Sequence, residues 1–209
     1  MELTNAQRVA KLTVDFVRGP QRLPRYLTHN VFTRRTPLDL ELPWFSYAAI
    51  DFLEDYLRSE MRVFEFGSGG STLFFGARCA AVAGVEDDAN WRQLVLSKAE
   101  ERGLGNIVLR HAPFDFAQRS GFETSEYLNA VRESRADVIV VDGNDPSFEF
   151  RPICFRAAEA EIAAGGIIIV DDSWRYTELR SDNRARRVEV FESVGPARFG
   201  VTSTDVYFY

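Results

Sequence analysis

The stretch that decides the fold of this 209-residue chain runs Phe64-Glu65-Phe66-Gly67-Ser68-Gly69-Gly70-Ser71-Thr72. Its apolar start is typical of a buried strand, and the residues after the glycines are typical of a helix. Gly67 and Gly69 permit tight or positive-φ backbone and let a ligand approach the chain closely. Ser71 or Thr72 can cap the helix that follows. The stretch therefore predicts a strand, a turn with ligand-binding potential, and a helix.

Downstream of this unit, short apolar runs alternate with helical periodicity. The run at 137–141 is nearly all β-branched and the run at 167–170 is entirely so, which is typical of parallel strands covered on both faces. We expect the last two strands to pair antiparallel, because no long helix separates them. The chain is thus predicted to be an α/β protein with a doubly wound, Rossmann-like seven-stranded sheet, mostly parallel with an antiparallel C-terminal strand, and helices on both faces. The expected strands are 62–66, 80–85, 106–109, 137–141, 167–170, 187–191 and 206–209, and the expected helices among them are 71–78, 91–99, 123–135 and 153–164.

Composition narrows the class of protein. The chain has 25 basic and 31 acidic residues, a formal charge of −6 and 45% hydrophobic residues, which excludes intrinsic disorder and a disulfide scaffold. The acidic balance argues against a dedicated nucleic-acid binder, because phosphate contacts need clustered positive charge. No apolar run is long enough for a bilayer and no signal-peptide core is present, so we expect no membrane association. Cys79 and Cys154 lie in apolar surroundings typical of buried thiols, so we expect a cytoplasmic protein.

The N-terminal part differs in character from the rest. A helical apolar face ends near Gly19, and four prolines follow at Pro20, Pro24, Pro37 and Pro43. We therefore divide the chain into an N-terminal helix with a loop-rich cap, residues 1–43, and a ligand-binding domain, residues 44–209.

An acidic residue completes the signal of the glycine turn. Glu86 ends the second expected strand, 19 positions after Gly67, where a carboxylate can bind both hydroxyls of a ribose. A dinucleotide site usually has a third glycine at the helix start, but Thr72 or Leu73 occupies that place here. Glu65 would repel a pyrophosphate, whereas it can bind a cationic amino-acid group. A nucleoside that carries such a group fits this turn best.

At this point the chain resembles the class I S-adenosylmethionine-dependent methyltransferases, over roughly residues 44–209. The resemblance rests on the acidic residue followed by Gly-x-Gly, on Glu86, on Asp142 after the fourth strand and on the closing antiparallel pair. It implies methyl transfer from S-adenosylmethionine to a small-molecule acceptor, at oxygen, and it implies that Glu86 holds the ribose. The turn residues that it places on the cofactor are Glu65, Gly67, Ser68, Gly69 and Ser71. Many relatives carry an acid after the third strand to contact adenine; this chain has Arg110-His111-Ala112-Pro113 instead, so Asp115 is the candidate for that contact.

Three further carboxylates follow the fourth and fifth strands. Asp142 follows one and Asp171-Asp172 the other, and adjacent strands lie about 4.8 Å apart, so we expect them to converge. Such carboxylates repel unless they are protonated, hydrogen-bonded or neutralised by a cation. The pattern is similar to that of metal-dependent O-methyltransferases, which implies a Mg²⁺ or Ca²⁺ ion on Asp142, Asp171 and Asp172. The alternative is a metal-free site in which Asp142 contacts the cofactor or acceptor and the Asp171-Asp172 pair caps a turn.

Two residues near these strand ends are candidates for the acceptor side. His111 follows the third strand and is a candidate general base beside Asp142, a stacking partner for adenine, or an ordinary partly buried histidine. Trp174 follows the acidic pair and is a candidate wall of the acceptor site.

Other functions remain open at this stage. Residues 142–146 resemble the Asp-x-x-Asp-Pro segment of aminopropyltransferases, although the N-terminal β-domain of that family is missing. A nucleic-acid base methyltransferase is a further alternative, but residues 144–148 resemble only loosely the segment that such enzymes carry after the fourth strand. A regulatory subunit that binds the cofactor without turnover is the non-enzyme alternative. The sequence leaves the identity of the acceptor and a homo-oligomeric state open.

Overall fold

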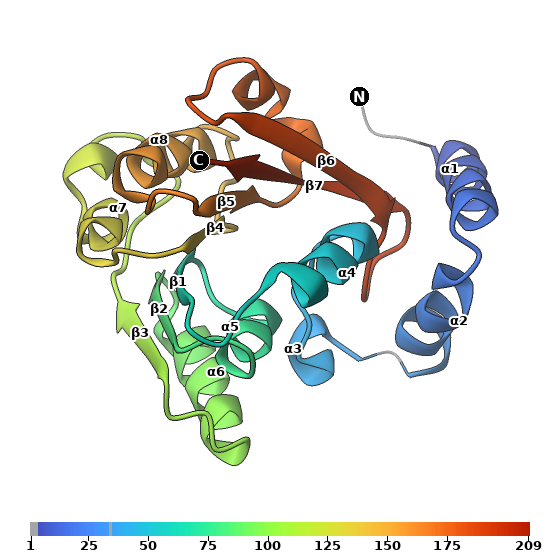
Figure 1. Cartoon of the computed structure of the whole chain (residues 1–209), viewed down its shortest axis with the longest axis horizontal. Coiled ribbons are helices and arrows are strands. Elements are labelled where there is room, and N and C mark those ends of the chain that lie inside the picture. The colour runs from blue at the N-terminus through green and yellow to red at the C-terminus, as the bar shows by residue number, and fades with distance from the viewer. Residues whose placement is uncertain (1–3, 34) are drawn as a thin grey trace.

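A seven-stranded sheet forms the centre of the molecule, with the strand order β3-β2-β1-β4-β5-β7-β6 (Figure 1). The computed structural model describes residues 4–33 and 35–209. Strands β1 to β5 are parallel, and β7 runs antiparallel to both β5 and β6. The predicted topology, mostly parallel with an antiparallel C-terminal strand, is therefore confirmed. The strands are β1 Arg62–Phe66, β2 Ala81–Glu86, β3 Ile107–His111, β4 Val138–Val141, β5 Ile167–Val170, β6 Arg187–Val194 and β7 Val201–Phe208.

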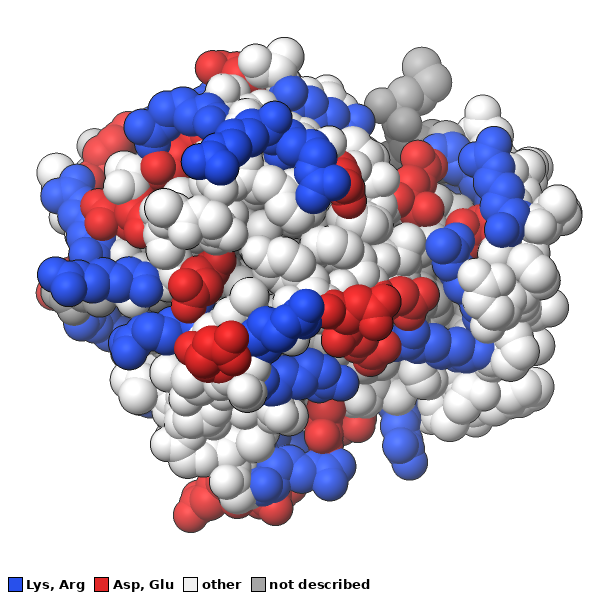
Figure 2. Space-filling view, in the orientation of Figure 1, with Lys and Arg blue, Asp and Glu red and all other residues white. Residues whose placement is uncertain are grey.

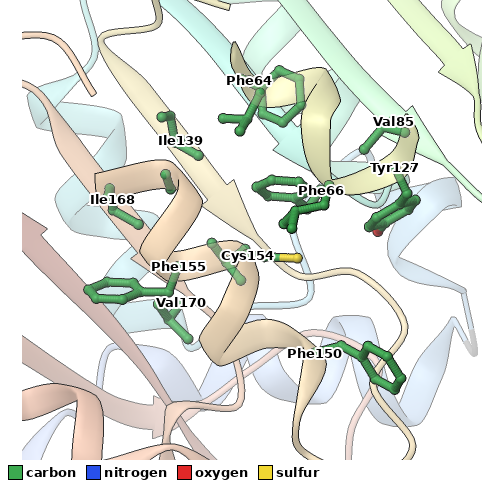
Figure 3. Packing of buried hydrophobic residues seen from close by; sticks show 14 of the residues in the cluster. Phe64, Phe66, Val85, Tyr127, Ile139, Phe150, Cys154, Phe155, Ile168 and Val170 are labelled. Carbon is green, nitrogen blue, oxygen red and sulfur yellow. The ribbon is translucent and has the colours of Figure 1, made fainter. Parts of the chain in front are cut away.

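Helices cover both faces of this sheet, and alternation along each strand sends side chains to both. Phe64 and Phe66 of β1 belong to the core that α8 covers, together with Cys154 and Phe155 of α8 and residues of β4 and β5 (Figure 3). Val63 of β1 belongs to the opposite core, which α4 and α5 cover. The helices are α1 Asn5–Arg18, α2 Arg22–Tyr26, a π-helical turn Leu27–Phe32, α3 Pro37–Leu40, α4 Tyr47–Tyr56, α5 Gly70–Gly76, α6 Ala89–Glu101, α7 Glu126–Asn129 and α8 Phe150–Glu161.

The single helix predicted over 123–135 is wrong. The segment is divided into a 3-10 turn Phe122–Thr124, helix α7 and a second 3-10 turn Ala130–Glu133. Ser125 causes the first break, because its backbone is extended and its hydroxyl caps α7 by accepting from the Leu128 amide at 3.2 Å. The last two strands are longer than predicted, because they pair with each other along their whole length.

The N-terminal helices lie beside the β6–β7 hairpin (Figure 1). Leu12 of α1 and Tyr26 of α2 are buried in the same core as Val63 and Val206 of the sheet. Asp15 of α1 accepts a hydrogen bond from the Val194 amide at 3.2 Å. This segment therefore shares a core with the sheet, and the boundary between 43 and 44 stays a prediction. Residues 1–3 and 34 of the predicted cap lie outside the described residues.

The remaining global expectations concern thiols and membranes. Cys79 and Cys154 are free and buried, as predicted. Among residues 4–33 and 35–209, no helix combines the length and the apolar character that crossing a bilayer requires.

Candidate functional site

The glycine turn joins β1 to α5 at the carboxyl end of the sheet, and its geometry requires glycine at two positions. Gly67 has φ +86°, and a Cβ there would lie 3.0 Å from the carbonyl oxygen of Asp142. A Cβ on Gly70 would lie 2.2 Å from the carbonyl oxygen of Leu42. Gly67 thus lets the turn pass close to β4, and Gly70 lets the start of α5 contact the segment before α4. Thr72 caps the turn, because its hydroxyl accepts from the Gly69 amide at 3.0 Å.

Glu65 is a buried carboxylate without a hydrogen-bond partner among the residues that the structure describes. Its side chain is 1% exposed, and within residues 4–33 and 35–209 neither carboxylate oxygen has a partner. The pKa of Glu65 is raised to about 7, mainly by burial and in addition by the charges of Asp142 and Glu86, while the nearby hydroxyls of Ser71 and Thr72 oppose the increase. A buried acceptor without a donor is costly, so this arrangement favours a ligand that brings a donor or a positive charge.

Glu86 lies at the end of β2 and fixes the same turn. Its Oε2 accepts from the Ser68 amide at 3.0 Å and from the Ser68 hydroxyl at 2.6 Å. Its Oε1 accepts from the amides of Asp87 and Asp88 at 3.1 and 3.2 Å. Burial raises the pKa of Glu86, and the hydrogen bonds from Ser68 oppose that. Each oxygen therefore already has two donors, and the carboxylate joins the ends of β1 and β2 in a fixed orientation.

Trp91, in the first turn of α6, closes the side of the turn. Its indole Nε1 donates to the Ser68 carbonyl at 2.8 Å, and its ring lies 3.8 Å from where a Cβ of Gly69 would stand. The side chain is 38% exposed, so one part of the ring is free for a further contact. For Trp91 the sequence predicts only that it begins the helix expected over 91–99. The available signal was its position five residues after Glu86.

The carboxylates after β4 and β5 converge as predicted, but arginines meet them. Arg151 of α8 forms an ion pair with Asp142 at 2.9 Å and also donates to the carbonyls of Gly143 and Asp171, both at 2.9 Å. Burial raises the pKa of Asp142, and the charge of Arg151 opposes the increase. Arg151 therefore ties the ends of the two strands together.

Arg198 lies in the turn between β6 and β7 and meets the second pair of carboxylates. Its guanidinium pairs with Asp172 at 2.8 Å and with Asp171 at 3.6 Å. Thr202 and Thr204 donate to the same carboxylates at 3.0 and 2.7 Å. Burial and the charge of Asp142 together raise the pKa of Asp171 to about 8, against the opposing charge of Arg198. Burial also acts to raise the pKa of Asp172, but Arg198, Arg175 and Thr202 together outweigh it, and the pKa of Asp172 is lowered.

The predicted Mg²⁺ or Ca²⁺ site has no support in this arrangement. In the described part of the chain, no group of three or more His, Cys, Asp and Glu side chains is placed to hold a metal ion. The oxygens of Asp142, Asp171 and Asp172 that would bind a cation face guanidinium and hydroxyl donors instead. A guanidinium and a divalent cation compete for the same carboxylate lone pairs, so the donor set as it stands does not fit the ion.

Of the other predicted residues, His111 and Asp115 lie apart from these carboxylates, and Trp174 follows Asp172 by two positions. His111 ends the edge strand β3 and meets the Asp87 carbonyl at 3.2 Å, and β2 and β1 separate it from β4 and Asp142. Asp115 is exposed, and its carboxylate accepts from the Ala117 amide and the Gln118 amide group, at 3.0 and 3.1 Å. Trp174 is 56% exposed beside Asp172, with the Arg175 guanidinium 4.9 Å from its ring. The roles predicted for these residues stay predictions.

Asp145, part of the segment that resembles aminopropyltransferases, has a structural role. Its carboxylate accepts from the amides of Glu149, Phe150 and Arg151 at 2.9–3.2 Å. The Tyr176 hydroxyl donates to it at 2.9 Å. Asp145 thus fixes the start of α8, which leaves it little capacity to bind a polyamine.

Several solved structures of known proteins share this architecture. No protein-family model matches the chain, and no curated protein does. A putative O-methyltransferase from Klebsiella pneumoniae has a similar structure, with a TM-score of 0.64 and 18% identity over 96% of this chain and 98% of that one. The O-methyltransferase TomG from Streptomyces achromogenes, in complex with SAM, has a TM-score of 0.60 and 16% identity over 99% of both chains. An rRNA methylase from Streptococcus thermophilus has a TM-score of 0.55 and 13% identity over 77% of this chain and 92% of that one. The fold is therefore the one seen in class I S-adenosylmethionine-dependent methyltransferases.

Proposed function

We propose that this chain is an enzyme that transfers the methyl group of S-adenosylmethionine to an oxygen atom of a small-molecule acceptor. In this reaction the acceptor oxygen forms a bond to the methyl carbon as the bond from that carbon to sulfur breaks. The sulfonium becomes a neutral thioether, and the hydroxyl proton of the acceptor passes to a base. Most of the catalytic effect would come from alignment of the two reactants, because the methyl donor is already activated.

The observation that carries this proposal is the unpartnered carboxylate of Glu65. It is buried at the end of β1, directly before the turn whose backbone at position 67 requires glycine. S-adenosylmethionine carries both an ammonium and a sulfonium group, which match a buried carboxylate in charge. A ligand with a pyrophosphate would instead meet Glu65 and Glu86 as like charges. The chemistry of the donor set therefore fits this cofactor better than a dinucleotide.

We assign the cofactor-holding roles along the same edge of the sheet. Glu65, Gly67, Ser68, Gly69 and Ser71 surround the amino-acid part. Glu86 holds the ribose, whose hydroxyls would replace the Ser68 hydroxyl that donates to Oε2 in the free protein, and Trp91 offers its exposed ring face to the nucleoside. Asp115 remains the candidate for the adenine.

We place the acceptor over the ends of β4 and β5. Asp142 is the candidate base, since its side chain is 26% exposed and lies between the glycine turn and α8. His111 lies too many strands away to share an acceptor with Asp142 unless the acceptor is large. Trp174 is the candidate wall.

Charge supports a small acceptor over a nucleic acid. The chain carries a net charge of −6, and acidic and basic side chains are interspersed on the face seen in Figure 2. A polynucleotide substrate would favour a continuous basic surface. We propose a cytoplasmic location for the enzyme, in keeping with two free buried thiols.

Isothermal titration calorimetry tests the proposal. We expect wild-type protein to bind S-adenosylmethionine, and we expect Glu86→Ala to bind it at least about tenfold more weakly, because a charge-assisted hydrogen bond contributes roughly 1.5–3 kcal/mol. Glu60→Gln, an exposed residue before β1, is the control and should bind as the wild type does. Equal affinity of wild type and Glu86→Ala would remove the ribose assignment.

A turnover assay separates the remaining alternatives. Methyl transfer to a panel of phenols, catechols and sugar hydroxyls, followed by release of S-adenosylhomocysteine, supports the enzyme. Donor binding without turnover on any acceptor would indicate a regulatory subunit. Turnover of decarboxylated S-adenosylmethionine with putrescine would indicate aminopropyl transfer.

A further inference from the structure

The guanidinium of Arg198 holds a central place among the strand-end carboxylates. It pairs with Asp172 at 2.8 Å and with Asp171 at 3.6 Å, and its side chain is 18% exposed. The same guanidinium donates to the Trp44 carbonyl at 3.0 Å. The backbone amide of Arg198 also donates to the Asn30 side chain at 2.7 Å. One residue of the β6–β7 turn therefore joins the carboxylates after β5 to the N-terminal segment.

The geometry of these carboxylates is fixed from several sides. Asp172 has φ +49°, a left-handed conformation that few residues other than glycine adopt, although Asp tolerates it better than most. Thr202 and Thr204 of β7 each donate to one of the two carboxylates. The oxygens are therefore held in place by the backbone and by β7 as well as by Arg198. Removal of Arg198 alone would leave the carboxylates of Asp171 and Asp172 in their contacts with the hydroxyls of Thr204 and Thr202.

Three arginines meet the three carboxylates at this edge of the sheet. Asp142, Asp171 and Asp172 carry three formal negative charges when ionised, and Arg151 and Arg198 bring two positive charges to them. Arg175 lies 3.7 Å from Asp172 as a more exposed third cation. Arg151 is engaged with three backbone carbonyls in addition to Asp142. Arg198 is therefore the cation on which Asp171 and Asp172 depend most.

We propose that Arg198 is the built-in cation of this carboxylate cluster and stands where a divalent metal ion would otherwise bind. The wild-type cluster then works without a metal, and the loss of the guanidinium converts it into a site for a hard divalent or trivalent cation. Arg198 is a positioning residue in this proposal: it keeps Asp171 and Asp172 in place and joins them to the backbone of Trp44. The proposal is independent of the methyl donor.

Terbium luminescence tests the proposal directly. Tb³⁺ prefers the same oxygen ligands as Ca²⁺, and excitation of nearby tryptophans, here Trp44 and Trp174, sensitises its emission. We expect the wild type to show no saturable emission, and we expect Arg198→Met to bind Tb³⁺ at least about tenfold more tightly than the wild type. Ca²⁺ should displace the ion from the variant and should raise the unfolding temperature of the variant but not of the wild type.

Three controls locate the effect. Arg198→Lys retains the charge and should gain no Tb³⁺ binding. Arg156→Met removes an arginine that pairs with Glu159 and Asp182, away from the cluster, and should also gain none. Arg198→Met combined with Asp171→Asn should lose the binding that the single variant gained.

Two results would overturn the proposal. One is a folded Arg198→Met variant that binds Tb³⁺ no better than the wild type. The other is saturable Tb³⁺ binding by the wild type that Asp171→Asn abolishes, and this measurement decides the matter even if Arg198→Met does not fold. Because neither titration contains S-adenosylmethionine, absence of donor binding would count against the proposed function only.

Discussion

Replacing Glu65 with glutamine should make the free protein more stable and its ligand affinity weaker. The carboxylate is 1% exposed and has no hydrogen-bond partner in the described part of the chain, and burial is the main cause that raises its pKa from 4.5 to about 7. In the unfolded chain the same group ionises near its ordinary value. At pH values between the unfolded pKa and the folded pKa, the folded protein keeps a proton that the unfolded chain has lost. The stability of the wild type therefore falls as pH rises through this window.

The size of the effect follows from the two pKa values. The difference is worth about 3 kcal/mol, at roughly 1.4 kcal/mol for each pH unit. Glutamine is nearly the same size and cannot ionise, so the variant should be about 3 kcal/mol more stable than the wild type near pH 8 and almost equal to it near pH 4. Urea denaturation at both pH values measures this difference, with Glu60→Gln as the exposed control.

The same variant should bind S-adenosylmethionine more weakly. A hydrogen bond to a charged group contributes roughly 1.5–3 kcal/mol, which corresponds to about a tenfold loss of affinity or more. Calorimetry near pH 8 gives the affinity of both proteins. The reasoning is refuted if Glu65→Gln stabilises the protein equally at both pH values, or if it binds the donor as tightly as the wild type.

Three further substitutions separate the roles of the site residues. Gly67→Ala should lower the free energy of unfolding by about 1–3 kcal/mol more than Gly103→Ala, because both residues have positive φ but only Gly67 faces a backbone carbonyl at 3.0 Å; urea denaturation of the two variants compares them. Asp145→Asn should destabilise the fold by about 1–2 kcal/mol with donor affinity unchanged, and a loss of donor affinity in calorimetry would contradict its purely structural role. Trp91→Phe removes the hydrogen bond to the Ser68 carbonyl but keeps an aromatic ring, so calorimetry should find donor affinity reduced by a factor of about ten or less; unchanged affinity would show that this contact does not order the turn.

Local sequence determined the sheet and the place of the glycine turn. Runs such as 137–141 and 167–170 are typical of buried strands in a parallel sheet. The spacing from Gly67 to Glu86 follows from one turn, one short helix and the next strand. For the same reason Asp142, Asp171 and Asp172 were predicted to converge: the carboxyl ends of neighbouring parallel strands meet at one edge. The helix predicted over 123–135 was wrong, because the capping of α7 by Ser125 outweighed the helical pattern around it.

Only the tertiary structure decided which charges neutralise those carboxylates. Arg151 and Arg198 come from a helix and a hairpin turn, and nothing in the spacing of the chain links Arg198 to Asp172, 26 residues away. A sequence pattern identifies which side chains a strand delivers to an edge, but the counter-ions arrive through long-range packing. Whether a carboxylate meets a guanidinium, a metal ion or water depends on that packing, and so does the isolation of Glu65, whose burial without a partner is a property of the folded chain.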